Sequence, residues 1–227
     1  MTLILGPLED LVKSNTLSSK DHHRISVIHQ SAVRLLNLIN QILDFRKTET
    51  QNKRLCVTKG NLTSAVYETG LKYKELNNKP EIQILIEVEE ENMVLFFDKE
   101  VITMILDNLI SNALKYTEKG YIRIRAEWVT ENGIRYAQLS VEDTGYGIGQ
   151  DALAHIFERY YQESGEHQAS GTGIGLALVK NLVKLHEGDI QVKSLPEIGT
   201  TFYLRLPAGN TYPQALHGED IHTDKQD

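Results

Sequence analysis

The sequence predicts an α+β protein in which a helical hairpin precedes a mixed β-sheet covered on one face by helices. In residues 20–47, apolar side chains recur alternately three and four positions apart, which is the period of a bundled helix. From residue 55 onward, short segments of strand and helix pattern follow one another without the strict strand–helix–strand order of a doubly wound fold.

The long helix predicted over residues 20–47 carries one apolar seam. Leu36 and Leu43 widen this seam to a face suited to a helical bundle. The seam itself consists of Ile25, Ile28, Ala32, Leu35, Ile39 and Ile42.

A shorter apolar pattern over residues 3–12, interrupted at Gly6-Pro7, predicts a preceding helix, and residues 15–19 a loop. A hairpin of this kind cannot bury its apolar stripe alone, so we expect two copies to form a homodimeric four-helix bundle. The alternative is that the long helix packs against the rest of its own chain.

The rest of the chain alternates between strand and helix patterns. Strands are predicted at residues 54–60, 82–90, 93–98, 121–130, 135–143, 189–195 and 200–207, and helices at 61–78, 99–120 and 173–188. Asn61 is a candidate helix cap, and residues 131–134, Glu-Asn-Gly-Ile, predict a hairpin turn. The predicted domains are therefore a hairpin at 1–50, an α/β domain at 51–208, and a linker or disordered tail at 209–227.

Composition excludes several classes of protein. The single cysteine, Cys56, rules out an internal disulfide framework and a zinc cluster of several thiolates, which fits a reducing, cytoplasmic setting. The net charge of −7 argues against a general nucleic-acid surface, and no apolar run approaches the ~18 residues that span a bilayer. We therefore expect this chain to contact neither nucleic acid nor membrane. In this acidic chain, a phosphate-bearing ligand would need a local group that attracts anions, such as a helix N-terminus or bound Mg²⁺.

The glycines of residues 145–149 directly follow a predicted strand. A dinucleotide fingerprint requires G-x-G-x-x-G, and Gln150 stands where its third glycine belongs. A second glycine run, at residues 171–175, fails in the same way because Leu176 takes that place. The Walker A signature and the protein-kinase motifs H-R-D and D-F-G do not occur, so the familiar phosphate-binding folds are disfavoured.

Five motifs occur in a fixed order: DNLISNALKYT at residues 107–117, DTGYGIG at 143–149, IFERYYQ at 156–162, GTGIGLAL at 171–178 and GTTF at 199–202. In this order they resemble the N box, first glycine box, F box, second glycine box and final Gly-Thr motif of sensor histidine kinases of two-component systems. The resemblance extends through the helical hairpin to nearly the whole chain. It implies a Bergerat-type α/β sandwich at residues 51–208 that binds Mg·ATP.

Asn108 and Asn112 lie four residues apart on a predicted helix, so both side chains point the same way and their carbonyl oxygens can meet Mg²⁺. The resemblance makes Asn112 the stronger metal ligand, with Asn108 beside it. Two asparagines at this spacing are, taken alone, more often a solvated helix face. Lys115 can approach a phosphate, and Tyr116 can lie against the adenine.

Asp143 is predicted to end a strand, where its carboxylate can accept a hydrogen bond from the adenine amine and so favour adenine over guanine. The alternative is an Asx-turn residue that supports the glycine bend. Gly145 and Gly147 would let the backbone pass close to the purine, with Ile148 as an apolar wall.

Gly171, Gly173 and Gly175 are predicted to open a helix whose free N–H groups hold the triphosphate. Leu176 is expected to lie on the inward side of this helix, near the base. Thr172 belongs to the same motif and is included among the ATP-binding residues.

The resemblance makes residues 150–170 an ATP lid, anchored by Phe157. Arg159 is a candidate phosphate-sensing residue, and a solvated arginine is the alternative. Thr201, in the final Gly-Thr motif, is also predicted to bind ATP.

In this family the phosphorylated histidine lies in a motif like S-H-E-L-R-T-P-L at the start of the first bundle helix. The opening residues MTLILGPLEDL resemble the segment directly after that motif, so the acceptor is expected upstream of Met1 and the hairpin is expected to be truncated. The histidines of the second helix, His22, His23 and His29, lack the flanking acid and Arg-Thr-Pro turn, and His155 and His186 suit packing or capping. We therefore expect no autophosphorylation of this chain.

The implied partners are a second copy of the chain and the receiver domain of a response regulator, to whose aspartate the phosphate is relayed. ILDFRKTET, residues 42–50, resembles the junction of hybrid sensor kinases of the Bacteroides type, in which a receiver domain can follow. We expect the chain to be the cytoplasmic portion of an inner-membrane sensor protein. The alternatives are a non-catalytic ATP-binding and dimerisation module, or another ATPase of the same superfamily. Such ATPases place a catalytic Glu where Asn108 stands here.

Overall fold

The computed structural model describes residues 6–7, 11, 18–49, 55–88, 92–162, 172–208 and 216–217. The chain divides into two compact units, Met1–Lys47 and Thr48–Asp227. Among the described residues, no helix is both long enough and apolar enough to cross a membrane.

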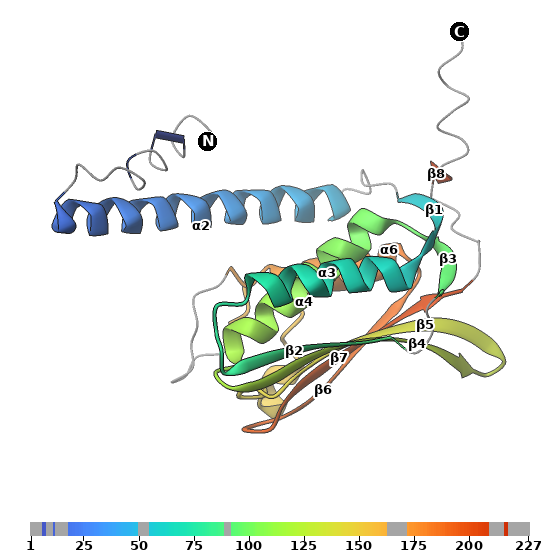
Figure 1. The fold of residues 1–227 in the computed structure, drawn as a ribbon. Coiled ribbons are helices and arrows are strands. Elements are labelled where there is room, and N and C mark those ends of the chain that lie inside the picture. Colours follow the sequence, from blue (N-terminus) through green and yellow to red (C-terminus); the bar gives the residue numbers. More distant parts are fainter. Residues whose placement is uncertain are drawn as a thin grey trace, which may run out of the picture. The chain divides into compact units, whose positions relative to one another are not determined.

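The long helix α2 (Ser19–Glu49) makes up most of the described part of the first unit (Figure 1). At its start, Ser18 Oγ accepts a hydrogen bond from Asp21 N–H at 3.2 Å and donates one to the Asp21 carboxylate at 2.6 Å. This cap satisfies one of the backbone donors that a helix leaves open at its first turn.

Apolar side chains stay exposed along α2, and they include several positions of the predicted seam. They are Val27, Ile28, Leu35, Ile39, Ile42 and Leu43. Most of the shorter helix predicted over residues 3–12, and almost all of its loop, lie outside the described residues; Gly6, Pro7 and Leu11 are helical. The prediction of a dimeric hairpin therefore stays a prediction.

The second unit is built on a five-stranded sheet in the order β2-β4-β5-β7-β6. Its strands are β2 (Ile82–Val88), β4 (Gly120–Glu131), β5 (Ile134–Asp143), β6 (Asp189–Leu195) and β7 (Gly199–Pro207). β2 runs parallel to β4, and the other neighbouring strands are antiparallel, so the predicted mixed sheet is confirmed. Figure 1 shows three helices on one face of this sheet: α3 (Leu62–Leu76), α4 (Lys99–Tyr116) and α6 (Gly175–Leu185).

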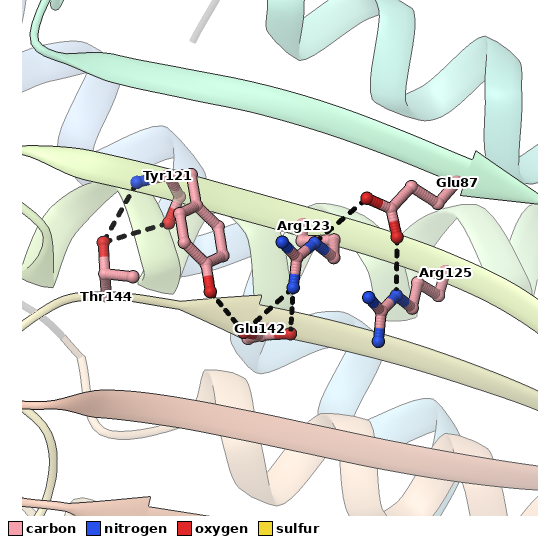
Figure 2. Close-up of polar contacts among 6 residues, drawn as sticks. All are labelled: Glu87, Tyr121, Arg123, Arg125, Glu142 and Thr144. Atoms are coloured by element: carbon pink, nitrogen blue, oxygen red, sulfur yellow. Dashed lines mark hydrogen bonds and ion pairs between the residues drawn. The ribbon is translucent and has the colours of Figure 1, made fainter.

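Strand alternation decides which side chains meet the helices. On β4, Ile122, Ile124 and Ala126 are fully buried on the helix-covered side. The residues between them point to the other face. There, Figure 2 shows acidic side chains of β2 and β5 on either side of the basic side chains of β4. Arg123 joins Glu87 and Glu142 at 3.1 Å each. Opposite charges on adjacent strands stabilise the register of a sheet whose outer face is polar.

A smaller three-stranded sheet, in the order β3-β1-β8, was not predicted. Its strands are β1 (Cys56–Asn61), β3 (Val94–Phe97) and β8 (Leu216–His217). β3 is antiparallel to β1, and β8 is a two-residue parallel addition to it. The short helix α5 (Gln150–Leu153), within the predicted lid, was not anticipated either.

Asp98 joins the small sheet to the helices at the start of α4. Its Oδ1 accepts a hydrogen bond from Val101 N–H at 3.1 Å, which caps the helix, and its Oδ2 accepts one from Cys56 N–H at 2.8 Å. Its own N–H donates to Nε2 of the buried His186, directly after α6, at 3.2 Å. One residue therefore positions the N-terminus of α4 relative to β1 and α6.

We predict that Asp98→Ala lowers the free energy of unfolding by about 2–3 kcal/mol, because it removes the cap and leaves the N–H of Cys56 without its acceptor. Chemical denaturation at neutral pH measures this loss. Lys99→Ala, which removes the exposed ion pair to Glu68, is the control and should cost less than about 1 kcal/mol. Equal losses in the two variants would contradict the role given to Asp98.

Candidate functional site

Most of the predicted site residues lie where α4 ends, where the loop after β5 begins and where α6 starts. Tyr146 N–H donates to Tyr116 O at 3.2 Å, which ties the glycine loop to the last residue of α4. A Cβ on Gly175 would lie 2.9 Å from Asn108 Oδ1, so the start of α6 passes close to the middle of α4. Three motifs that are distant in sequence therefore line one region.

Asp143 is the last residue of β5, and its side chain lies on the helix-covered face with only 8% of the residue exposed. Burial raises the pKa of its carboxyl to about 6, against hydrogen bonds from the N–H groups of Gly145 and Thr200 that lower it; the nearby Glu142 adds a smaller increase. The Gly145 N–H donates to Oδ1 at 2.9 Å, so the Asx-turn alternative also holds for this carboxyl. Within the described part of the chain, the donors to this carboxylate are backbone N–H groups. Such a buried acceptor is suited to a ligand donor.

The glycine loop fits only because two of its residues have no side chain. A Cβ on Gly145 would lie 2.4 Å from Tyr116 O, and one on Gly147 would lie 2.0 Å from Leu195 O. Gly147 also has a φ of 69°, which favours glycine. Thr144, just before the loop, accepts a hydrogen bond from Tyr121 N–H through its Oγ1 at 3.0 Å (Figure 2). The loop is therefore fixed against β4 and α4.

The amide residues of the N box lie on α4 as the spacing predicts. Asn108 is half-buried, and its Nδ2 donates to Met104 O at 2.8 Å, which orients the side chain and leaves Oδ1 on the side of Gly175. Asn112 is also half-buried, one turn further on. At the end of the helix, Lys115 Nζ donates to Tyr116 Oη at 2.8 Å and lies 4.5 Å from the centre of its ring. This contact holds the cation and the aromatic ring together at the end of α4.

The start of α6 bears the second glycine box. Gly173 has a φ of 66°, and its carbonyl accepts a hydrogen bond from Tyr160 N–H at 2.9 Å. The N-cap residue Ile174 makes no side-chain capping bond to the helix. Thr172 Oγ1 accepts a 3.3 Å bond from Ile174 N–H, which precedes the helix, and Leu176 is half-buried in the first turn. The open N–H groups of this 11-residue helix are suited to an anion.

The remaining predicted residues are placed less centrally. Gly171 lies outside the described residues, and Arg159 is exposed within the F box. Phe157 packs edge-on against Phe202, with ring centres 6.4 Å apart, which anchors the segment to β7. The sites predicted at Gly171 and Arg159 stay predictions.

Thr201 is placed on the outer face of the sheet, opposite Glu142, away from Asp143. Its neighbour Thr200 is buried and pairs with Asp143 across the ladder. Phe202, Leu204 and Leu206 are buried at alternate positions of β7, so Thr200, two residues before Phe202, lies on the same helix-covered face. Sequence reasoning missed Thr200 and also Ser194, whose Oγ accepts a hydrogen bond from Ile148 N–H at 2.8 Å.

The raised pKa of Asp143 predicts a pH-dependent stability in the nucleotide-free chain. The folded state holds this proton up to about pH 6 while the unfolded state releases it near 3.8, so the stabilising contribution is present below about pH 4 and is lost as pH rises through 6. The stability of Asp143→Asn relative to the unmodified chain should therefore increase by roughly 2–3 kcal/mol between pH 4 and 7.5. Denaturant titrations across this range measure the difference. A difference that does not vary with pH would contradict the burial argument.

The family described as "Histidine kinase-, DNA gyrase B-, and HSP90-like ATPase" matches residues 97–210, which include the site. The chain is 32% identical over 219 residues to "Histidine kinase P4" of Formosa agariphila and 36% identical over 209 residues to "Autoinducer 2 sensor kinase/phosphatase LuxQ" of Vibrio harveyi. These alignments cover 94% and 90% of the chain but 16% and 24% of the two relatives, so the chain spans under a third of their length.

Among solved structures, full-length ShkA in complex with AMPPNP shares the fold. Its TM-score is 0.74 at 24% identity, and the alignment covers 93% of this chain and 45% of that one. Together with the five ordered motifs and the geometry of the site, these matches show that the chain belongs to the histidine kinase-, DNA gyrase B- and HSP90-like ATPase family and contains the catalytic domain of a sensor histidine kinase.

Proposed function

We propose that this chain is the kinase core of a two-component sensor, which binds Mg·ATP for phosphoryl transfer to a histidine and then to a response-regulator aspartate. The observation that carries the proposal is the buried carboxylate of Asp143 at the end of β5. It lies beside a loop in which two positions, Gly145 and Gly147, have room only for glycine. A buried carboxylate without a charged partner among the described residues costs stability, and such costly groups are concentrated at functional sites.

Adenine recognition would rest on Asp143. Its carboxylate accepts hydrogen bonds but, when ionised, cannot donate them, so it matches the exocyclic amine of adenine and repels the carbonyl that guanine carries there. Gly145 and Gly147 keep the nearby backbone free of side chains, and Ile148 offers an apolar contact. Tyr116, which is 37% exposed at the end of α4, can lie along the ring.

The phosphates would be held by the start of α6 and by the amides of α4. The helix start has open N–H groups, which suit an anion in a protein whose net charge is −7. Asn112 and Asn108 supply neutral oxygen ligands of the kind Mg²⁺ accepts together with phosphate oxygens. Bound Mg²⁺ would neutralise phosphate charge, while the chain's own residues hold and orient the nucleotide.

The receiving histidine is expected to be none of those in this chain. The exposed side chains of His155 and Glu158 lie 2.8 Å apart, and His186 is buried next to Asp98. Acid-labile, base-stable phosphate on the purified chain after incubation with γ-labelled ATP would contradict this expectation.

Two alternatives remain open. A non-catalytic ATP-binding and dimerisation module would bind nucleotide through the same residues and transfer nothing. A chaperone-like or repair-type ATPase needs a general base on the N-box helix, and that position holds Asn108, whose amide cannot accept a proton at neutral pH. Rapid release of inorganic phosphate would favour that ATPase alternative.

The wider context is proposed from the relatives. The hybrid organisation, the receiver domain and the cytoplasmic placement are inferred from the resemblance. "Histidine kinase P4" is from Formosa agariphila, a member of the Bacteroidetes, which supports the proposed Bacteroides-type origin. The exposed seam of α2 supports the proposed homodimer, because apolar stripes of this period bury themselves against other helices.

We predict that Asp143→Asn weakens binding of Mg·ATP about a hundredfold or more, since hydrogen bonds to a charged acceptor contribute about 1.5–3 kcal/mol and the amide places a donor toward the adenine amine. Isothermal titration with a non-hydrolysable ATP analogue at pH 7.5 measures it. Glu142→Gln is a matched control, because Glu142 is the adjacent carboxylate on the opposite face of β5. It should change the affinity less than about threefold. Unchanged affinity in Asp143→Asn would place the adenine site elsewhere.

We also predict that Leu35→Lys shifts the chain from dimer to monomer, because it puts a charge in the middle of an apolar seam. Sedimentation velocity over a concentration series measures the shift. His23→Lys, which adds the same charge at an exposed position off the seam, should leave the dimer intact. An unmodified chain that stays monomeric at high concentration would contradict the dimer.

A further inference from the structure

The glycine loop rests on the hairpin between β6 and β7. Ile148 N–H donates to Ser194 Oγ at 2.8 Å, and Tyr146 O accepts a hydrogen bond from Glu197 N–H at 2.7 Å. Between these bonds, Gly147 passes so close to Leu195 O that a Cβ there would lie 2.0 Å from it. The loop therefore has its position set from behind by residues 194–197.

The hydroxyl of Ser194 has all of its hydrogen-bonding capacity in use. It lies 2.9 Å from Gly199 O, which can only accept, so the one hydroxyl hydrogen of Ser194 is committed to that carbonyl. The contact to Thr200 Oγ1, at 2.8 Å, then requires Thr200 to be the donor. With Ile148 N–H as the second donor, one hydrogen and two lone pairs are all satisfied. Ser194 is 8% exposed, so water is poorly placed to replace these bonds.

The same cluster reaches Asp143. Thr200 faces Asp143 across the β5–β7 ladder, and its backbone N–H bonds to the Asp143 carboxyl. Ser194 faces Thr200 across the β6–β7 ladder. One buried pair of hydroxyl residues thus contacts both the loop and the strand end that would enclose the purine.

We propose that Ser194 is a positioning residue of the adenine site. Its hydroxyl fixes the Ile148 backbone, and through it the loop formed by residues 145–148, at the distance from Asp143 that the purine requires. Ser194 acts through this loop and does not touch the nucleotide. The inference rests on the proposed binding of ATP at this site.

The test compares Ser194→Ala with Ser194→Thr, which keeps the hydroxyl and suits a strand. In Ser194→Ala, the dissociation constant of the Mg²⁺ complex of a non-hydrolysable ATP analogue should rise about tenfold, because the loop loses a buried hydrogen bond. Hydrogen exchange of the Ile148 amide should also accelerate in the nucleotide-free chain. Ser194→Thr should stay within about threefold of the unmodified chain. Ser140→Ala, which truncates another buried serine of the same sheet, should leave both measurements unchanged.

Circular dichroism at the assay temperature establishes that each variant is folded, so that a change in affinity reports on the site. If Ser194→Ala fails to fold, Thr200→Val replaces it, because it removes the hydroxyl donor to Ser194 with little change of shape; a smaller rise in the dissociation constant is then expected. Unchanged affinity and unchanged Ile148 exchange in the folded variants would overturn the inference. If the unmodified chain bound no ATP, the proposed function would fail, while faster Ile148 exchange would still support the positioning role.

Discussion

The site depends on a close approach of backbone to backbone, where the loop after β5 passes between the end of α4 and the β6–β7 hairpin. At Gly145 the neighbouring atom is a carbonyl oxygen of Tyr116, and at Gly147 it is a carbonyl oxygen of Leu195. Backbone atoms cannot move aside as a flexible side chain can, so only hydrogen fits at both positions. The elements on either side are in turn fixed by the core of the sheet and by Asp98 at the far end of α4. This arrangement fixes the backbone of the loop that we propose encloses the purine.

The carboxylate at this site illustrates a conflict between stability and function. Burial raises the pKa of Asp143 to about 6. At neutral pH the side chain is therefore a buried negative charge that accepts hydrogen bonds from the backbone N–H groups of Gly145 and Thr200. An amide or an apolar residue would avoid this cost in stability, but neither could offer the adenine amine a negatively charged hydrogen-bond acceptor. The opposite face of the same strand shows the contrast, because Glu142 there is paired with Arg123 and Tyr121. Adjacent residues of β5 thus differ in role: Glu142 stabilises the sheet on one face, and Asp143 is proposed to bind adenine on the other.

Much of this architecture could be predicted from the sequence because its signals are local. Hydrophobic period and turn residues indicate the helices and strands, including the Asn132-Gly133 turn, where both residues have positive φ. The small sheet could not be predicted, because β1 pairs with strands about 40 and 160 residues away and no local pattern encodes such pairing. The motif alone does not indicate that Thr200, and not the predicted Thr201, shares a face with Asp143, because moving one residue along a strand reverses the face on which a side chain lies. Ser194 could not be predicted as a site residue, because a serine on an edge strand looks like any solvated serine until its three partners are brought together.

We propose that Asp143 accepts a hydrogen bond from the adenine amine while α4 and α6 hold the phosphates. The most direct measurement is a crystal structure of this chain with Mg²⁺ and a non-hydrolysable ATP analogue. We predict that the adenine amine lies within hydrogen-bonding distance of an Asp143 oxygen, that Asn112 Oδ1 binds Mg²⁺, and that phosphate oxygens lie at the start of α6. A nucleotide bound with its base away from Asp143, or with its phosphates remote from both helices, would contradict it.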